Sequence, residues 1–342
     1  MNAGPAAPTI QDGPERNGGI SLAVMVDGTV REHHGEAALQ DLERLLKEAR
    51  QVHGLVWIDL SSPTKVQVEH ASDLLGLHPL IAEDILEGRQ RPKLEATDDL
   101  IQIVLFALDD TAELRAHEID LVVGDAFLLS SHPTEWNPRG GAHFRGDLAG
   151  VMRGGPDHLL WAICDEIVDA YFPFADHLED TIDALQDAVM ERTDRDTLAR
   201  VFDLKRQLIG IRRAITPVRE VLNQLTNREL ALIDPAELLY FRDIYDHVIR
   251  LTDELDNDRE LVTATLDVYL SQVNNNLSAI MKRLTGVTVI IAGIGAIAGI
   301  FGMSEAGQAF SGGEALGFWA VAVGTIALSA LAALVLHRLD WI

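Results

Sequence analysis

Two long stretches without a charged residue constrain the fold of this chain more than any other feature. The first runs from Leu284 to Ser304 and the second from Ala315 to Leu336. Each is long enough to cross about 30 Å of hydrocarbon as an α-helix, which rises about 1.5 Å per residue. A buried hairpin in a soluble domain is the alternative, but two adjacent runs of this length favour membrane helices. We therefore expect an integral membrane protein.

The residues that flank the two runs predict how they lie in the membrane. Lys282 and Arg283 precede the first run, His337 and Arg338 follow the second, and the connection between the runs contains no basic residue. Basic residues are retained on the cytoplasmic side of a membrane. We therefore expect a multi-pass protein of the cell membrane, in contact with lipid, with both termini in the cytoplasm. The N-terminal residues contain no signal-peptide core, so insertion through this hairpin is expected.

The chain is strongly acidic, with a net charge of −25 at pH 7, and most of this charge precedes the apolar runs. Nucleic acid is excluded as a partner, because binding to phosphates needs a basic surface. An acidic surface raises the local concentration of cations, although solubility alone explains many of these carboxylates. The sequence shows no phosphate-binding glycine loop, nucleophile elbow or nucleophile–base pair. We predict that the protein is not an enzyme.

Residues 20–155 combine strand and helix patterns, which predicts an α/β domain. Residues 1–19 are rich in glycine, proline and alanine, which predicts a disordered tail. The expected strands are Leu22–Val26, Leu55–Leu60, Ile101–Leu108, Ile119–Val123 and Ala126–Leu129. The expected helices are Ala37–Ala49, Lys65–Leu75 and Leu80–Glu87.

Residues 156–233 carry helical patterns only. One amphipathic stretch runs from His158 to Glu191 and a second from Asp196 to Asn227, with a short polar turn between them. This arrangement predicts an antiparallel helical pair. Pro173 and Pro217 fall inside the two stretches, and we expect them to bend the helices rather than end them.

A very long helix is predicted to follow. Asp234 and Pro235 form a strong helix start, because aspartate caps the first turn and proline suits its first position. Neither glycine nor proline occurs again before Gly286. We predict a stalk over residues 234–283 that continues into a first membrane helix over 284–304. A loop over 305–314, a second membrane helix over 315–337 and a cytoplasmic end over 338–342 follow. Apolar seams along the stalk imply partner helices, and parallel copies in an oligomer would supply them.

Four stretches resemble a known family of transport proteins. They are His78–Lys93, Phe241–His247 (Phe-Arg-Asp-Ile-Tyr-Asp-His), Tyr269–Thr285 and Ile300–Ser304 (Ile-Phe-Gly-Met-Ser). Their order and spacing resemble the CorA/ZntB family of divalent metal cation transporters. The resemblance implies an α+β membrane protein that forms a homopentameric funnel, with a cytoplasmic α/β domain, a long helical stalk and two C-terminal transmembrane helices. It also implies that the first of these helices lines a pore for Mg²⁺ or Co²⁺, or for Zn²⁺.

The pore signature departs from that family at one position. The family signature ends in Gly-Met-Asn, whereas this chain has Gly302, Met303 and Ser304. Serine is shorter than asparagine and offers one hydroxyl, so a ring of serines would hold a hydrated ion less firmly. Ser278 likewise stands where magnesium-transporting members carry asparagine. Glu305 either supplies a ring of carboxylates at the mouth or simply ends the helix in water.

Helical spacing inward from Ser304 predicts which side chains face the pore. Leu284 and Met281 would form an apolar constriction, which can close a pore by dewetting. The glycines in the row would alternatively permit close packing between helices. The predicted row is Gly299, Gly295, Ala292, Thr288, Leu284, Met281 and Ser278.

The resemblance also implies a regulatory metal site between neighbouring subunits. Asp84 and Asp243 would hold the ion, with Glu83 and His247 nearby. Two carboxylates about 4 Å apart repel each other by about 4 kcal/mol at an effective dielectric constant of 20, and a cation between them reverses that sign. Solvated surface acids are the competing interpretation. The same two interpretations apply to Asp165 and Asp169, which are spaced to share one helical face.

Three functions are compatible with these patterns. The first is a CorA-like channel for Mg²⁺ or Co²⁺, gated by metal bound between cytoplasmic domains. The second is a ZntB-like, proton-coupled zinc transporter, which the absence of charged residues from both apolar runs disfavours. The third is a non-conducting membrane scaffold or metal sensor.

Overall fold

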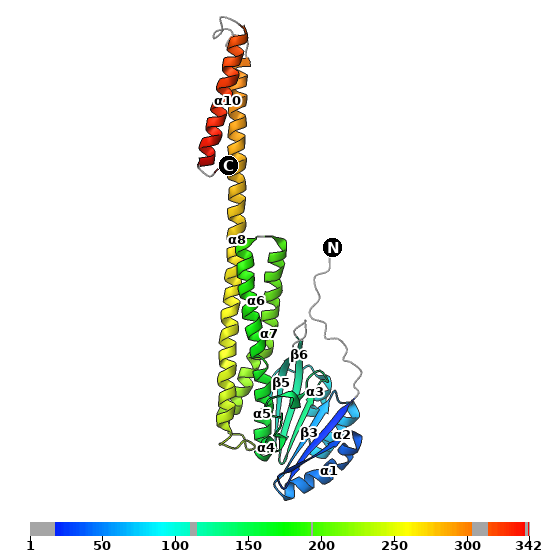
Figure 1. Ribbon diagram of the computed structural model, residues 1–342. Helices are drawn as coiled ribbons and strands as arrows, with labels where there is room; N and C mark the ends of the chain where they lie inside the picture. The colour runs from blue at the N-terminus through cyan, green and yellow to red at the C-terminus, as the bar shows by residue number, and fades with distance from the viewer. Residues whose placement is uncertain (1–17, 110–114, 193, 303–313, 339–340, 342) are drawn as a thin grey trace. The chain divides into compact units, whose positions relative to one another are not determined.

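The computed structural model describes residues 18–109, 115–192, 194–302, 314–338 and 341 (Figure 1). The chain divides into two compact units. One unit contains residues 1–184 and 202–262, and the other contains residues 185–201 and 263–342. Most of the predicted N-terminal tail and of the predicted loop over 305–314 lies outside the described residues. So do Met303, Ser304 and Glu305, three of the predicted pore residues.

A seven-stranded mixed sheet forms the centre of the first unit, in the order β2-β1-β3-β7-β6-β5-β4. Neighbouring strands are antiparallel except for the parallel pair β3 and β7. The strands are β1 (Gly19–Val26), β2 (Thr29–His34), β3 (Leu55–Ser61), β4 (Lys93–Ala96), β5 (Leu100–Asp109), β6 (Arg115–Gly124) and β7 (Phe127–His132). The five expected strands are confirmed, and β2 and β4 were missed. Both missed strands are the polar edge strands, which lack the apolar pattern of the interior.

Three helices cover one face of this sheet (Figure 1): α1 (Glu36–Gln51), α2 (Lys65–Leu75) and α3 (Pro79–Glu87). All three were predicted. Thr64 and Gln67 form a capping box at the start of α2. Gly88 ends α3 with φ of 57°, a left-handed conformation that glycine adopts without strain. The turn at Gly88 carries the chain back to β4, and it positions one of the sites described below.

The opposite face of the sheet is covered by α5 (Pro156–Asp169), which contacts β5, β6 and β7. A short 3₁₀ helix (Pro138–Gly140) and α4 (Leu148–Arg153) precede it. The expected single stretch from His158 to Glu191 is divided, because α5 ends at Asp169 and α6 (Phe172–Glu191) begins after it. Tyr171 lies in the break, fully buried, and its hydroxyl donates to the carbonyl of Phe106. Pro173 therefore lies in the first turn of a new helix, where proline is tolerated, and the prediction of a mere bend was wrong.

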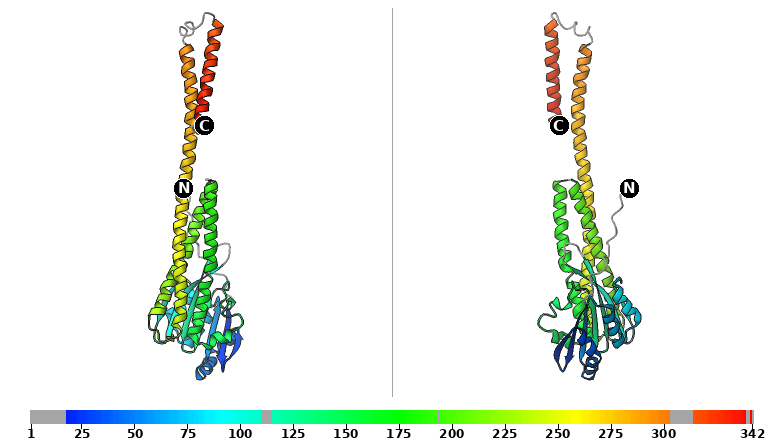
Figure 2. Two further views of the ribbon diagram at one scale, coloured as in Figure 1. Left: turned by 60° about the vertical axis from the view of Figure 1, so that its left-hand side comes forward. Right: turned by 90° about the vertical axis from the view of Figure 1, so that its right-hand side faces the viewer.

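Helix α7 (Arg195–Asn227) contains Pro217 in its interior, as predicted. Helix α8 (Leu238–Gly302) is a single helix of 65 residues (Figure 2), which confirms the prediction of one very long helix. It begins later than Asp234, whose carboxylate accepts from the backbone N–H of Ala236 and whose own N–H donates to Asp157. This residue therefore belongs to a turn that is attached to α5.

The apolar end of α8 fits the expectation of a membrane helix. Among the described residues, α8 is the one helix that is long and apolar enough to cross a membrane, and the apolar window is 6% buried. The last helix, α10 (Glu314–Arg338), contains a shorter apolar segment, Ala322–Arg338. The second membrane crossing and the homopentamer stay predictions.

Candidate metal centre and pore helix

Three metal-binding side chains converge between α5 and α8. Asp165 and Asp169 lie one turn apart on α5, so their carboxylates share a helical face. His247 of α8 approaches them, and one ligand atom from each of the three lies within 4.8 Å of the others. Two ligand atoms of a tetrahedral zinc ion, each about 2.1 Å from the metal, are about 3.4 Å apart. Small side-chain movements would therefore suffice for the three to hold one ion.

Two further groups border this centre. Asp243, one turn from His247 on α8, places its Oδ2 at 4.0 Å from His247 Nε2, and Asp169 Oδ1 lies 4.0 Å from His247 Nδ1. His143 Nε2 lies 2.6 Å from Asp165 Oδ2. The set therefore comprises three carboxylates and two imidazoles. Such a mixture suits Co²⁺ or Zn²⁺, whereas Mg²⁺ prefers oxygen ligands alone.

Crowded carboxylates make this centre attractive to a cation. Partial burial and the negative charge of Asp165 raise the pKa of Asp169, and His247 and His143 only partly oppose them. Asp243 is 72% exposed, so the centre opens to solvent on one side. A divalent cation could enter from solvent and relieve the repulsion between the acids.

The structure distributes the four predicted metal residues over two helices and three places. Asp243 and His247 lie together at the centre on α5 and α8. Asp84 lies on α3, where its carboxylate accepts from Lys93 Nζ at 2.6 Å and Gln90 Nε2 at 2.8 Å, and is 18% exposed. Burial by itself would lower the pKa of Lys93, but the hydrogen bonds of its ammonium group to Asp84 and Glu95 raise that pKa overall.

Glu83 borders a separate surface pocket beside α2. The pairing of Asp84 with Asp243 across a subunit interface stays a prediction.

His143 was not identified from the sequence. It lies between the 3₁₀ helix and α4, in a segment without periodicity, so no pattern indicated that it pairs with Asp165. The ring of Trp161 stacks edge-on against it, with 4.7 Å between the ring centroids. Only the packing of this segment onto α5 brings the imidazole and the carboxylate together.

The predicted pore residues that the structure describes lie along the exposed part of α8. Leu284 is 60% exposed and Met281 similarly so, and Ser278, Thr288 and Ala292 are also exposed. A Cβ placed at Gly295 or Gly299 would meet no described atom within 4 Å. Gly302 is the last residue of α8. The single chain thus leaves the whole row accessible, and the pore face itself stays a prediction.

Comparison with known proteins shows to which protein family the chain is related. The family described as CorA-like Mg²⁺ transporter protein matches residues 52–338. The chain is 34% identical over 265 residues to the cobalt/magnesium transport protein CorA of Thermotoga maritima, and the match covers 72% of each protein. It is 31% identical over 251 residues to the putative metal ion transporter YfjQ of Bacillus subtilis, covering 72% of this chain and 78% of that protein.

One more distant sequence relative and two solved structures are also similar to this chain. The zinc transport protein ZntB of Enterobacter sp. is 27% identical over 182 residues, covering 53% of this chain and 54% of that protein. The structure of the CorA magnesium transporter from Methanocaldococcus jannaschii superposes with a TM-score of 0.76 at 24% identity, covering 94% of this chain and 98% of that one. Full-length CmaX superposes with a TM-score of 0.70 at 18% identity, covering 97% and 100%. At these identities the two structures establish a shared fold.

Proposed function

This chain belongs to the family of CorA-like Mg²⁺ transporter proteins, and on that premise we propose that it conducts Mg²⁺ or Co²⁺ across the cell membrane. The observation that carries the proposal is helix α8. This one continuous helix joins an acidic domain to an apolar segment whose side chains are exposed in the single chain. An exposed apolar surface of this extent requires lipid or further copies of the chain.

Five copies arranged around an axis, with both termini in the cytoplasm, would cover this surface and enclose a pore. Small and polar side chains on the outer part of α8 would contact the hydration shell of the ion, which Mg²⁺ gives up reluctantly. Met281 and Leu284 would form the constriction. The lining residues proposed are Ser278, Met281, Leu284, Thr288, Ala292, Gly295, Gly299 and Gly302, with Met303, Ser304 and Glu305 at the mouth.

Metal bound at the cytoplasmic side would regulate this pore. The group of Asp165, Asp169 and His247, bordered by Asp243, is the proposed sensor. Asp84 and Glu83 of a neighbouring copy would complete it. Because Lys93 holds Asp84 within its own chain, the pairing across the interface would require Asp84 to exchange an ammonium partner for the ion. A ligand that favours one arrangement in this way shifts the population toward it.

A second function is favoured by the chemistry of the same centre. His143 and His247 bring nitrogen ligands next to carboxylates, a combination typical of zinc sites. ZntB-like, proton-coupled zinc transport is therefore the alternative. A non-conducting scaffold or metal sensor is the third proposal, because the Gly-Met-Ser sequence departs from the family signature.

Flux through the purified protein in liposomes tests these proposals directly. Uptake of Mg²⁺, Co²⁺ and Zn²⁺ would be followed with an internal dye at two external pH values. We expect uptake of Mg²⁺ or Co²⁺ that does not depend on pH. Zinc uptake that increases with a proton gradient would replace the channel by the ZntB-like transporter. No uptake of any of the three ions, by folded and oligomeric protein, would overturn transport and support the sensor.

A further inference from the structure

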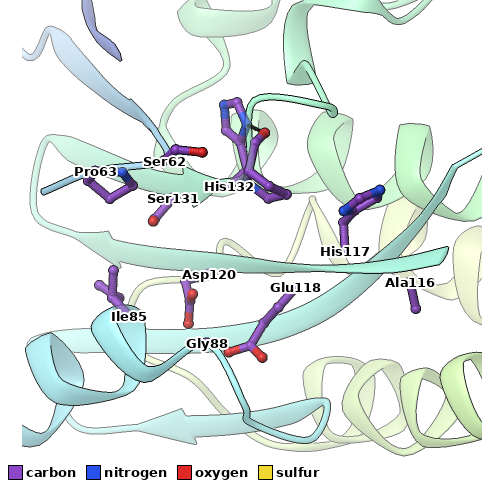
Figure 3. A pocket seen from close by; sticks show the side chains of 11 residues that line it. Ser62, Pro63, Ile85, Gly88, Ala116, His117, Glu118, Asp120, Ser131 and His132 are labelled. Carbon is purple, nitrogen blue, oxygen red and sulfur yellow. Dashed lines mark hydrogen bonds between the residues drawn. The ribbon is translucent and has the colours of Figure 1, made fainter. Parts of the chain in front are cut away.

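A second acidic site lies inside the α/β domain, away from the centre on α5 and α8. It is a pocket of about 240 Å³ between β6 and the end of α3. Figure 3 shows the carboxylates of Glu118 and Asp120 on the same side of β6, directed toward Gly88, while His117 points to the other side. Neither Glu118 nor Asp120 stood out in the sequence.

The register of the sheet explains why these two acids meet. Asp120 on β6 lies opposite Val104 of β5 and Ser131 of β7. Glu118 lies two residues away on the same strand, and alternate residues of a strand share one face. The next residue on this face, Val122, belongs to the apolar core beneath the helices. The two carboxylates therefore occupy positions that a core would otherwise fill with apolar side chains.

Each of these acids has a carboxylate oxygen that accepts no hydrogen bond from the described residues. Asp120 is 3% exposed, and its Oδ1 has no hydrogen-bond partner among the described residues. Glu118 Oε2 accepts from the backbone N–H of Gln90 at 2.9 Å, but its buried Oε1 likewise has no hydrogen-bond partner in the described part of the chain. Buried polar atoms are almost always paired, and an exception calls for a bound proton, water or ion.

The local charges favour a divalent ion. Asp84, Glu118 and Asp120 would together carry three negative charges, and Lys93 contributes one positive charge next to Asp84. Lys93 also pairs with Glu95 at 3.1 Å, so the carboxylates of this group outnumber its one ammonium and a divalent cation would offset their excess negative charge. Burial raises the pKa of Glu118 to about 7 and raises that of Asp120 well above its usual range. Burial thus disfavours the two ionised carboxylates, and a cation beside them would offset that cost.

We propose that Glu118 and Asp120 bind a divalent cation within each chain, through Glu118 Oε1 and Asp120 Oδ1, with water completing the coordination. Carboxylate oxygens and water suit Mg²⁺ and Mn²⁺ better than softer metals. The site needs no neighbouring subunit, which distinguishes it from the regulatory centre.

A cation bound by Glu118 and Asp120 would affect Asp84, the residue predicted to bind metal between subunits. Gln90 joins the two places, because its backbone N–H donates to Glu118 and its side-chain amide donates to Asp84. An ion that holds Glu118 in place also holds Gln90, and thereby the hydrogen bond to Asp84. The internal site would thus set how readily Asp84 leaves Lys93.

Binding of Mn²⁺ to the full-length protein in detergent tests the site independently of transport. The measurement uses a background in which Asp169→Asn, Asp243→Asn and His247→Ala remove the regulatory centre. Free Mn²⁺ is measured by electron paramagnetic resonance. We expect about one Mn²⁺ bound per chain, and a loss of affinity of at least about tenfold when Asp120→Asn or Glu118→Gln is added. Asp125→Asn, an exposed acid on the turn after β6, is the matched control and should change nothing.

Two outcomes would overturn the proposal. One is a background protein that binds no Mn²⁺, which would mean that the acids hold protons only. The other is unchanged binding in both Asp120→Asn and Glu118→Gln. The melting temperature of each variant without metal shows that it is folded, and Mn²⁺ should raise that temperature in the background protein but not in the variants. Because no ion gradient is involved, a failure of transport would leave this result unaffected.

Discussion

The first and the last parts of α8 contain the same kinds of apolar side chain, but only one part is buried by its own chain. Phe241, Ile244 and Val248 are fully buried, whereas Leu284 and Ile291 are largely exposed. No break separates the two parts, because α8 is continuous. The difference shows that one copy of the chain completes the folded domain but leaves the apolar end of α8 to lipid or to other copies.

The acidic residues show the same contrast on a smaller scale. Asp84 and Glu118 are bound by groups of their own chain, whereas Asp243 projects from α8 into solvent. Binding sites within the domain can therefore be tested by its stability. Sites that depend on the exposed surface of α8 must be tested by assembly or flux.

The largest effect is expected from removing a buried side chain of α8. Phe241→Ala should lower the free energy of unfolding by about 3–5 kcal/mol, because it leaves a cavity in a packed interior. Ile291→Ala is the matched control and should change it by less than about 0.5 kcal/mol. Urea unfolding of the full-length protein, followed by tryptophan fluorescence, measures both. Equal losses would show that the two parts of α8 do not differ in this way.

Metal binding at the centre on α5 and α8 should have the next largest effect. Co²⁺ at about 100 times its dissociation constant should raise the free energy of unfolding by about 2.7 kcal/mol, and chelation should reverse the change. His247→Ala and Asp169→Asn should abolish most of it. His70→Ala, which removes an exposed histidine on α2, should not. Stabilisation that persists in both centre variants would exclude this centre as the binding site.

Glu118 should make the stability of the domain depend on pH. Burial, supported by the negative charge of Asp84, raises the pKa of Glu118 in the folded protein to about 7, above the ordinary value of 4.5. The folded state therefore binds the proton of Glu118 more tightly than the unfolded state does. This contribution to the free energy of unfolding is complete below pH 4.5 and is lost as the pH rises toward 7. Since one pKa unit corresponds to 1.36 kcal/mol and the side chain is partly exposed, the loss should be about 2 kcal/mol.

Unfolding of the wild type and Glu118→Gln in metal-free buffer between pH 4.5 and 8 measures this loss. The variant should become relatively more stable as the pH rises. Glu69→Gln, at an exposed acid of α2, serves as the control and should follow the wild type. A constant difference between wild type and Glu118→Gln across this range would refute the assignment.

The smallest effect on stability is expected at the proposed constriction. Leu284→Ala should change the free energy of unfolding by less than about 0.5 kcal/mol, because the side chain is exposed in the single chain. It should nevertheless increase ion flux into liposomes at high metal concentration, since a smaller and less apolar ring closes less well by dewetting. Ile291 lies outside the predicted pore row, so Ile291→Ala should leave the ion flux unchanged. Equal increases in both variants would contradict the predicted pore face.

Sequence patterns predicted the interior strands and the helices of the α/β domain because their apolar residues repeat locally. The edge strands β2 and β4 escaped prediction, because β2 is largely polar and β4 has four residues, of which only Leu94 is buried. The break before α6 also escaped. It depends on the bond from Tyr171 to Phe106, which joins residues far apart in the chain.

The candidate sites divide in the same way. Asp243 and His247 were predicted as metal residues from the family resemblance, whereas Asp165 and Asp169 were singled out because their spacing puts them on one helical face. The meeting of these two pairs depends on the packing of α5 against α8, and His143 joins them because its own segment packs onto α5. The acids of the internal pocket gave no signal, because an acid within a strand pattern carries no mark of its burial.

The sequence by itself determined that the chain belongs in a membrane, that it is acidic ahead of its apolar runs, and that one helix extends into the first of them. These properties depend on composition and on short-range periodicity, which every stretch of the chain carries within itself. Only the tertiary structure decided that Asp84 is bound to Lys93, that Glu118 lies on the same face of β6 as the buried Asp120, and that Asp165 and Asp169 face His247. Burial and pairing depend on contacts between residues that are distant in sequence, so only the packed fold could decide which of the many carboxylates are placed to bind a metal.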